Sequence, residues 1–144
     1  MLNLSYLHSA HVLVVDDCFD TCGVLCALLT QVGYENVSSM TDGKLLLDGE
    51  TGNYFSLIVL DMHMPTLDGL EIMRHLRSKQ TGYCVPVIAI SGDQRYRTVA
   101  IAAGAYAFLL KPFNRGGIGI HNLQCAIKLS KTTCFSYHRW IAYF

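Results

Sequence analysis

The sequence predicts an α/β fold, a doubly wound (βα)5 domain around a five-stranded parallel sheet, and three observations lead to this prediction. Short apolar runs alternate with segments whose apolar residues recur at helical spacing, which is the pattern of βαβ units. The 144 residues, 51% of them hydrophobic, are enough for one sheet covered by helices on both faces. Three apolar runs, 11–15, 55–60 and 105–110, lead directly into charged residues. In a parallel sheet such strand ends lie at one edge.

In the first half of the chain, turn and cap residues separate the expected elements. Asp20 is a suitable N-cap for the first helix, and Gly33 is a suitable stop. The segment Thr41-Asp42-Gly43 predicts a turn between a weak strand and a short second helix.

Similar signals follow in the second half. Asp68-Gly69 opens the third helix, and Gly104 is a C-cap glycine for the fourth. The apolar residues of that fourth helix are expected to face inward, namely Tyr96, Val99, Ala100 and Ala103. The complete set of expected elements is five strands at about 11–16, 36–40, 55–60, 86–90 and 105–110, and five helices. Four of these helices are expected at about 20–33, 44–50, 94–104 and 118–130. The third helix opens at Asp68-Gly69 and buries Leu70, Met73 and Leu76.

Composition and patterning exclude several classes of protein. No run reaches the roughly 18 apolar residues of a membrane span, and no basic segment with an apolar core marks a signal peptide. We therefore expect a cytoplasmic protein for which membrane association is unlikely. The six cysteines include no C-x-x-C pair, so we interpret them as reduced thiols.

Charge is unevenly distributed although the formal net charge is zero. Residues 1–93 contain all 11 acidic residues, whereas residues 94–144 contain 7 of the 11 lysines and arginines. This asymmetry indicates either a solvated basic face or an anionic partner surface. No nucleic-acid partner is expected, because no recognised binding motif is present.

Charged residues at three strand ends form a candidate site. Asp16 and Asp17 follow the first strand, Asp61 follows the third, and Lys111 follows the fifth. In an open parallel sheet the loops beyond these ends form the ligand crevice, so three carboxylates and one ammonium group can meet there. Such a combination suits a divalent cation beside a phosphoryl group.

These residues, with their neighbours, resemble the receiver domain of two-component response regulators over about residues 10–130. The matching motifs are Asp16-Asp17, Asp61 within Val59-Leu60-Asp61-Met62-His63-Met64-Pro65, the following Asp68-Gly69, Ser91-Gly92, and Lys111-Pro112-Phe113. Four such elements in order at four expected strand ends are highly specific. The resemblance implies a flavodoxin-like receiver fold and a role in phosphorelay signalling.

The resemblance also implies a role for each residue of the site. Asp61 is the phosphoacceptor, and Lys111 and Ser91 contact the phosphoryl oxygens. Mg²⁺, with Mn²⁺ as a possible substitute, is bound by Asp17, Asp61 and the His63 backbone carbonyl, and by Asp16 mainly through water. Pro112 is expected to follow a cis peptide bond.

Four positions are implied in control of the signal. Ser91 and Phe108 are the switch residues that transmit phosphorylation to a face formed by helix 4, strand 5 and helix 5, and the alternative for Phe108 is a plain core residue. His63 and Asp93 lie where receivers tune dephosphorylation, by shielding the phosphoryl group or by orienting water. These two residues could therefore either lengthen or shorten the lifetime of the phosphoryl group.

The expected function is that of a single-domain response regulator. It accepts a phosphoryl group from a histidine kinase or histidine phosphotransfer protein, and it binds a downstream protein, with a homodimer as a further possibility. Residues 1–9 are an N-terminal extension, 10–130 the receiver, and 131–144 an apolar tail with helical spacing. The Gly116–Gly119 segment departs from the family pattern and leaves the output face in doubt.

Three alternatives remain beside this function. In the first, the chain is a phosphorylation-independent scaffold or pseudo-receiver. In the second, it is a receiver cut from a larger hybrid kinase or regulator. A phosphatase of the haloacid dehalogenase type is disfavoured, because it needs a second acid where this chain has His63. The expected protein is therefore not an enzyme beyond its own phosphorylation and dephosphorylation.

Overall fold

A computed structural model describes residues 8–48, 55–78, 85–113 and 121–127. Its strands are β1 (His11–Val15), β2 (Asn36–Met40), β3 (Leu57–Asp61), β4 (Val87–Ser91) and β5 (Ala107–Leu110). Its helices are α2 (Phe19–Val32), the 3-10 helix η1 (Gly43–Leu46), α3 (Gly69–Ser78) and α4 (Tyr96–Ala102). Residues 121–127 are also helical and lie within the expected fifth helix.

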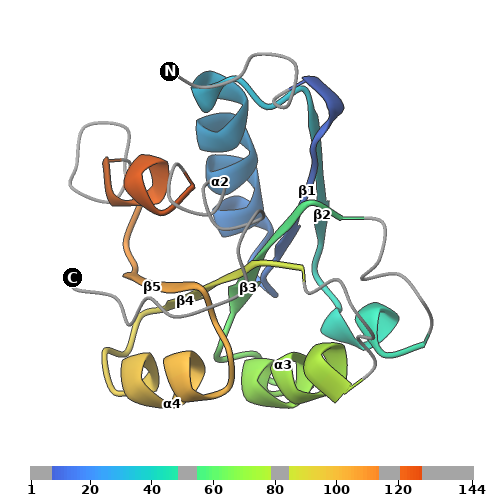
Figure 1. Cartoon of the computed structure of the whole chain (residues 1–144), viewed down its shortest axis with the longest axis vertical. Helices are drawn as coiled ribbons and strands as arrows, with labels where there is room; N and C mark the ends of the chain where they lie inside the picture. The colour runs from blue at the N-terminus through green and yellow to red at the C-terminus, as the bar shows by residue number, and fades with distance from the viewer. Residues whose placement is uncertain (1–7, 49–54, 79–84, 114–120, 128–144) are drawn as a thin grey trace.

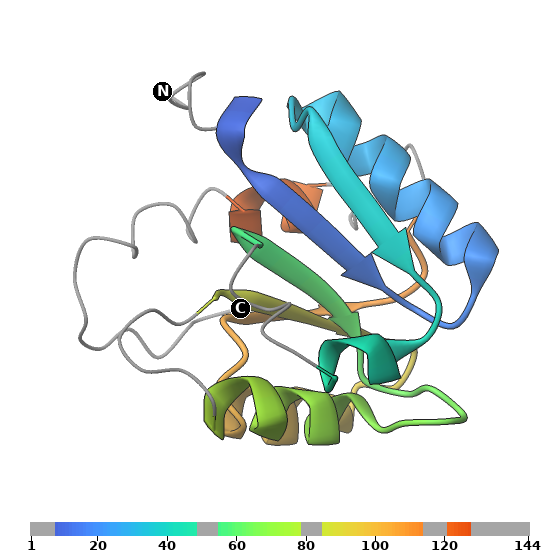
Figure 2. The same ribbon diagram turned by 90° about the vertical axis from the view of Figure 1, so that its right-hand side faces the viewer.

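All five strands are parallel and lie in one sheet with the order β2-β1-β3-β4-β5. Figure 1 shows α2 and the helical residues 121–127 on one face of the sheet, and α3 and α4 on the other. Figure 2 shows the strands running in the same direction beside one another. The predicted doubly wound α/β fold is therefore confirmed.

Each face of the sheet has its own hydrophobic core, because side chains alternate along the strands. Val12 and Val14 pack on the α2 face, whereas Leu13 and Val15 pack on the face of α3 and α4. The central strands are buried on both faces, and β3 has no exposed residue. This burial explains why the apolar runs in the sequence are continuous rather than alternating.

The prediction that Asp20 caps the first helix is wrong. The helix begins at Phe19 with Cys18 as its N-cap, and Asp20 lies in the first turn, where its charge suits the positive end of the helix dipole. Asp16 Oδ1 accepts a hydrogen bond from the Cys18 backbone N–H at 2.9 Å, so the chain turns into the helix two residues earlier than expected. The predicted stop at Gly33 is confirmed by its left-handed φ of 109°.

The predicted second helix, 44–50, is shorter in the structure. One turn of 3-10 helix spans Gly43–Leu46, with the Asp42 side chain accepting from the Lys44 backbone N–H at 3.0 Å. Leu45 is 56% exposed, so only one side of this turn contacts the core. Residues 49–54 lie outside the described residues.

The expected inward orientation of Val99 is also wrong. Its side chain is 44% exposed, and Ala100 is the only fully buried residue of the short helix α4. The helix ends at Ala102, and Gly104, two residues later, has the positive φ of 98° expected of a terminating glycine.

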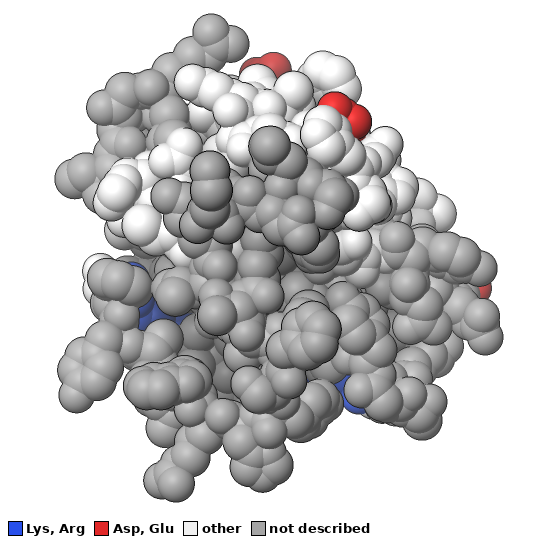
Figure 3. Space-filling view, turned by 45° about the horizontal axis from the view of Figure 1, so that its top comes forward, with Lys and Arg blue, Asp and Glu red and all other residues white. Residues whose placement is uncertain are grey.

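The remaining sequence predictions concern the surface and the ends of the chain. Within the described residues, no helix is long and apolar enough to cross a membrane. Figure 3 shows only scattered acidic and basic atoms on the described part of one face. The expected tail 131–144, the Gly116–Gly119 segment and four of the seven C-terminal basic residues lie outside the described residues.

Candidate phosphorylation site

The carboxyl ends of the strands carry the polar residues that the sequence singled out. Asp61 and Ser91 are the last residues of β3 and β4, whereas Asp16 and Lys111 directly follow β1 and β5. Register pairs Asp61 with Ile90 and Ser91 with Leu110, so these ends are level across the sheet. Because the strand order reverses between β1 and β3, the helices leave the sheet on opposite faces there and open a crevice.

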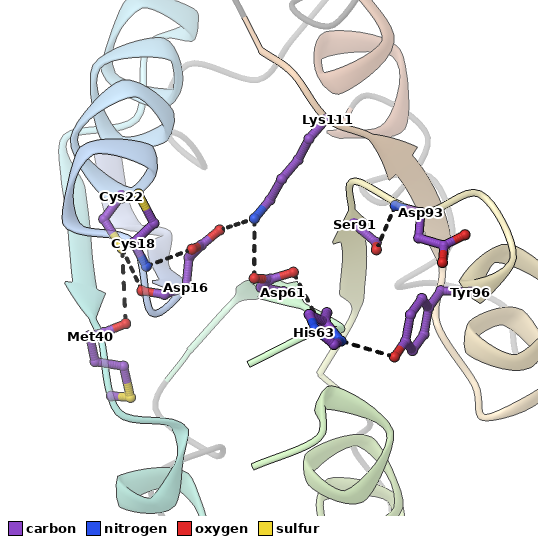
Figure 4. Close-up of polar contacts among 10 residues, drawn as sticks. All are labelled: Asp16, Cys18, Cys22, Met40, Asp61, His63, Ser91, Asp93, Tyr96 and Lys111. Carbon is purple, nitrogen blue, oxygen red and sulfur yellow. Dashed lines mark hydrogen bonds and ion pairs between the residues drawn. The ribbon is translucent and has the colours of Figure 1, made fainter. Parts of the chain in front are cut away.

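Lys111 joins the two buried carboxylates of the site (Figure 4). Its Nζ lies 2.6 Å from Asp16 Oδ2 and 3.1 Å from Asp61 Oδ2. The Asp16 and Asp61 side chains are 0% and 4% exposed, and that of Lys111 is 23% exposed. The ammonium group therefore compensates two negative charges from which water is largely excluded.

Burial sets the electrostatics of this group. Desolvation raises the pKa of Asp61 above its ordinary value, and the neighbouring Asp16 charge acts in the same direction, against the opposing effect of Lys111. Burial lowers the pKa of Lys111, but hydrogen bonds and charges from Asp16 and Asp61 outweigh it and raise the pKa overall. The lysine is thus held in its charged form.

Three carboxylates of the site form a cluster that fits a hard dication. Asp16, Asp17 and Asp61 each offer an oxygen, and these atoms lie within 4.8 Å of one another. Asp17 is exposed whereas the other two are buried, so an ion would be reached from solvent on the Asp17 side. All-oxygen donors at this spacing suit Mg²⁺ or Mn²⁺ better than a thiophilic metal.

Short turns after the strands fix the orientation of the site residues. Asp61 Oδ1 accepts from the His63 backbone N–H at 3.2 Å, and Ser91 Oγ accepts from the Asp93 backbone N–H at 3.0 Å. Each side chain thereby closes a turn with the residue two places on. The Lys111–Pro112 peptide bond is cis, as the sequence resemblance implied.

Gly69 explains why the Asp68-Gly69 pair matters to this arrangement. A Cβ atom at Gly69 would lie 2.4 Å from the Asp61 carbonyl oxygen and 2.6 Å from the Met62 Cα. The start of α3 can approach the end of β3 this closely only without a side chain. Asp68 Oδ1 accepts from the Leu70 backbone N–H at 3.0 Å and so caps the helix.

A second group of polar residues lies on the α4 side of the crevice (Figure 4). His63 Nδ1 is hydrogen-bonded to the Tyr96 hydroxyl at 3.2 Å. Asp93 binds Arg95 through contacts of 2.6 to 3.0 Å, and hydrogen bonds from Arg95 lower the pKa of Asp93 to about 2. A pocket beside Ser91 is lined by His63, Ser91, Gly92, Asp93, Arg95, Tyr96 and Val99.

Two of these contacts were missed by sequence reasoning. Tyr96 was expected to face the core and does pack against it in part, but its bond to His63 was not expected, and Arg95 was not considered. The spacing Asp93-x-Arg95 is compatible with a local ion pair, but nothing in the sequence indicates that Tyr96 reaches His63, 33 residues away.

Phe108, the expected switch aromatic, lies inside the core. Its side chain is 6% exposed and packs among residues of α3, α4 and the strands. The Arg97 guanidinium carbon lies 5.3 Å from the centroid of its ring, within the range of a cation–π contact. Phe108 thus links β5 to α4, whether as core or as switch.

The cysteines that the structure describes are all free thiols, namely Cys18, Cys22, Cys26 and Cys125. Burial, followed by the Asp16 charge, raises the pKa of Cys22 to about 11. Its thiol donates to the Asp16 backbone carbonyl at 3.2 Å. For these four positions the prediction of reduced thiols agrees with the structure, and Cys84 and Cys134 lie outside the described residues.

The fold and the crevice define a class of protein, a doubly wound α/β domain with an acidic cluster and a buried lysine at the carboxyl edge of its sheet. The response regulator receiver domain matches residues 12–119 of this chain. The chain therefore belongs to the response regulator receiver family, whose domains act as phosphoacceptors in signalling.

Relatives of the chain include a sensor kinase/phosphatase and a transcriptional regulatory protein. The chain is 33% identical over 111 residues to the CAI-1 autoinducer sensor kinase/phosphatase CqsS of Vibrio cholerae, covering 75% of this chain and 16% of that protein. It is 37% identical over 105 residues to the transcriptional regulatory protein PrrA of Mycobacterium bovis, covering 73% and 45%. The chain thus spans less than half the length of these two relatives.

A solved structure with a similar fold is the receiver domain of the histidine kinase CKI1 from Arabidopsis thaliana, complexed with Mg²⁺ and BeF3⁻. The TM-score is 0.72 at 29% identity, with 91% of this chain and 95% of that chain covered.

Proposed function

We propose that this receiver accepts a phosphoryl group on Asp61 from a phosphohistidine of a histidine kinase or a histidine phosphotransfer protein. The observation that carries the proposal is the buried Asp61 carboxylate, held 3.1 Å from Lys111 Nζ within the acidic cluster. The similarity to CqsS, a sensor kinase/phosphatase, and to PrrA, a transcriptional regulatory protein, supports a place in a phosphorelay.

The proposed reaction transfers phosphorus from nitrogen to oxygen. A carboxylate oxygen of Asp61 forms a bond to phosphorus as the bond from phosphorus to the donor imidazole nitrogen breaks, and that nitrogen keeps the electron pair. Lys111 Nζ, between Asp16 and Asp61, is placed to donate to a phosphoryl oxygen. The Ser91 hydroxyl, which accepts from the Asp93 N–H, keeps its own proton to donate to another.

The acidic cluster is proposed to hold Mg²⁺, or Mn²⁺ in its place. Asp17 and Asp61 would bind the ion with the His63 backbone carbonyl, and Asp16 would act mainly through water. When bound, the ion neutralises the carboxylates and the phosphoryl oxygens during transfer. The Mg²⁺ and BeF3⁻ of the CKI1 receiver support this assignment by analogy.

The proposed output is a protein-binding face formed by α4, β5 and the helix that contains residues 121–127. Phosphorylation would draw Ser91 toward the phosphoryl group, and the contact of Phe108 with Arg97 would carry the change to α4. A single-domain regulator in the cytoplasm is the simplest context, and the free thiols of the described cysteines support that compartment.

A second candidate is a receiver that forms one part of a longer hybrid kinase or regulator. The small share of CqsS and PrrA that the chain covers favours this alternative. The site chemistry is the same in both cases, so only the output differs.

The test uses acetyl phosphate as donor and intact mass as readout. We expect a phosphate adduct in the wild type that requires Mg²⁺ and is absent from Asp61→Asn. Asp68→Asn is a matched control, because asparagine can still cap α3. No wild-type adduct with either Mg²⁺ or Mn²⁺ would overturn the proposal and favour a phosphorylation-independent scaffold.

A further inference from the structure

Tyr96 connects α4 to the segment that follows the phosphoacceptor. Its hydroxyl is hydrogen-bonded to His63 Nδ1 at 3.2 Å, and the two ring centroids lie 6.1 Å apart with a tilt of 58°. Figure 4 shows the two side chains meeting between β3 and α4, on the opposite side of Asp61 from Asp16. None of the proposed contacts with metal or phosphoryl oxygens requires this bond.

The backbone of His63 is already tied to the nucleophile, because its N–H donates to Asp61 Oδ1 at 3.2 Å. The His63 side chain, by contrast, is exposed and would rotate freely without a partner. Among its described contacts, Tyr96 alone bonds the ring, and it does so from the first residue of a helix, a rigid support. The ring is therefore held at the wall of the pocket that Ser91 and Tyr96 also line.

We propose that Tyr96 is a positioning residue that holds the His63 ring across the α4 side of Asp61 and thereby slows hydrolysis of the aspartyl phosphate. In this hydrolysis a water oxygen bonds to phosphorus as the bond from phosphorus to the Asp61 oxygen breaks. The carboxylate leaves with the electron pair, and water gives a proton to solvent. An aromatic wall between solvent and phosphorus restricts the approach of that water.

The inference rests on the proposed phosphorylation of Asp61. The sequence left open whether His63 lengthens or shortens the lifetime of the aspartyl phosphate, and here it lengthens it. We commit to shielding because the Tyr96 hydroxyl engages Nδ1 and so holds the ring in one place. In this proposal the ring acts through its position.

The test is the rate of phosphate loss after labelling with acetyl phosphate and Mg²⁺ and removal of the donor. We expect Tyr96→Phe to lose phosphate about fivefold faster than wild type, the rate equivalent of one lost hydrogen bond, while its rate of labelling stays nearly unchanged. Tyr106→Phe is the matched control, because Tyr106 precedes β5 at the opposite edge of the sheet.

A double mutant separates positioning from general loosening of the structure. If Tyr96 acts through His63, Tyr96→Phe has no further effect in a His63→Leu background, and the two changes are not additive. Equal or slower phosphate loss in Tyr96→Phe, or full additivity with His63→Leu, would overturn the inference while leaving the phosphorylation of Asp61 intact. Absence of any wild-type adduct would overturn both proposals.

Discussion

The two sides of the crevice differ in burial and in the kind of contact that holds them. On the side of β1, β3 and β5, Asp16, Asp61 and Lys111 form a buried ionic group with side chains no more than 23% exposed. On the α4 side, Asp93 and Arg95 form an ion pair whose side chains are 35% and 90% exposed. Coulombic energies are large on the first side and screened by water on the second.

Because of this difference, we expect the buried side to determine the stability of the protein and the α4 side to tune the rate of phosphate loss. A change in the buried ionic group alters how buried charges are compensated in a medium that solvates them poorly, so it alters the free energy of unfolding. On the α4 side, water already solvates the charged side chains, so a change there is expected to affect reaction rates rather than stability. The following three predictions test this separation, beginning with the largest expected effect.

Replacing Lys111 with methionine should destabilise the protein by about 3 kcal/mol, because Asp16 and Asp61 would remain buried without a compensating cation. Urea unfolding at neutral pH measures the change. The matched control is Lys44→Met, since Lys44 is an exposed lysine on η1. Equal unfolding midpoints for the two variants would show that the buried carboxylates do not depend on Lys111.

Replacing Asp61 with asparagine should have the opposite sign and stabilise the protein by about 1 kcal/mol at pH 7. The pKa of Asp61 is raised in the folded protein above its ordinary 3.8, so the folded state binds more protons than the unfolded state above that pH. Stability of the wild type therefore falls as pH rises through the window between the two values. Lys111 keeps Asp16 as partner in the variant.

The gain in Asp61→Asn should shrink as pH falls toward about 4, where the carboxyl of unfolded chains is itself protonated. Thermal unfolding of both proteins between pH 4 and 7 tests this dependence. Asp68→Asn, at an exposed helix cap, should show no comparable gain. A stability difference that is constant across this range would contradict the burial argument.

Replacing Asp93 with alanine should have the smallest effect on stability and a measurable one on rate. Its pKa of about 2 keeps it ionised from pH 5 to 8, so its contribution to stability does not vary in that range and is lost only as pH falls below about 4. As an acceptor for water beside Ser91, its loss should slow phosphate release about fivefold, the equivalent of one hydrogen bond.

Acetyl phosphate labelling of Asp93→Ala should proceed at nearly the wild-type rate, so the ratio of labelling to loss is the quantity to measure. Asp93→Asn, which retains a side-chain acceptor for the Arg95 backbone N–H, controls for disruption of the turn. Equal phosphate loss in Asp93→Ala and wild type would remove the proposed role.

The sequence predicted the fold and the buried side of the crevice well, for a common physical reason. A strand buried on both faces must be continuously apolar, so the runs before Asp16, Asp61 and Lys111 are visible without a structure. Parallel strands end at one edge, which places these charges together. Gly33, with its φ of 109°, is likewise visible because few other residues adopt that conformation.

Local signals were less reliable where several side chains compete for one turn. Asp20 is a good cap by type, but the Asp16 side chain already directs the chain at Cys18, so the helix begins before it. Val99 has the spacing of a core residue, yet α4 is too short to bury more than Ala100 completely.

The sequence by itself determined the parallel sheet and identified the acids and the lysine at its strand ends. Buried strands leave continuous apolar runs in the sequence, and each of these charged residues stands at the end of such a run. Only the tertiary structure decided that Lys111 bridges Asp16 and Asp61, that Gly69 touches the end of β3, and that Tyr96 bonds His63. Such contacts depend on the distance and angle between separate elements, which packing of whole helices on the sheet fixes and no local sequence pattern encodes.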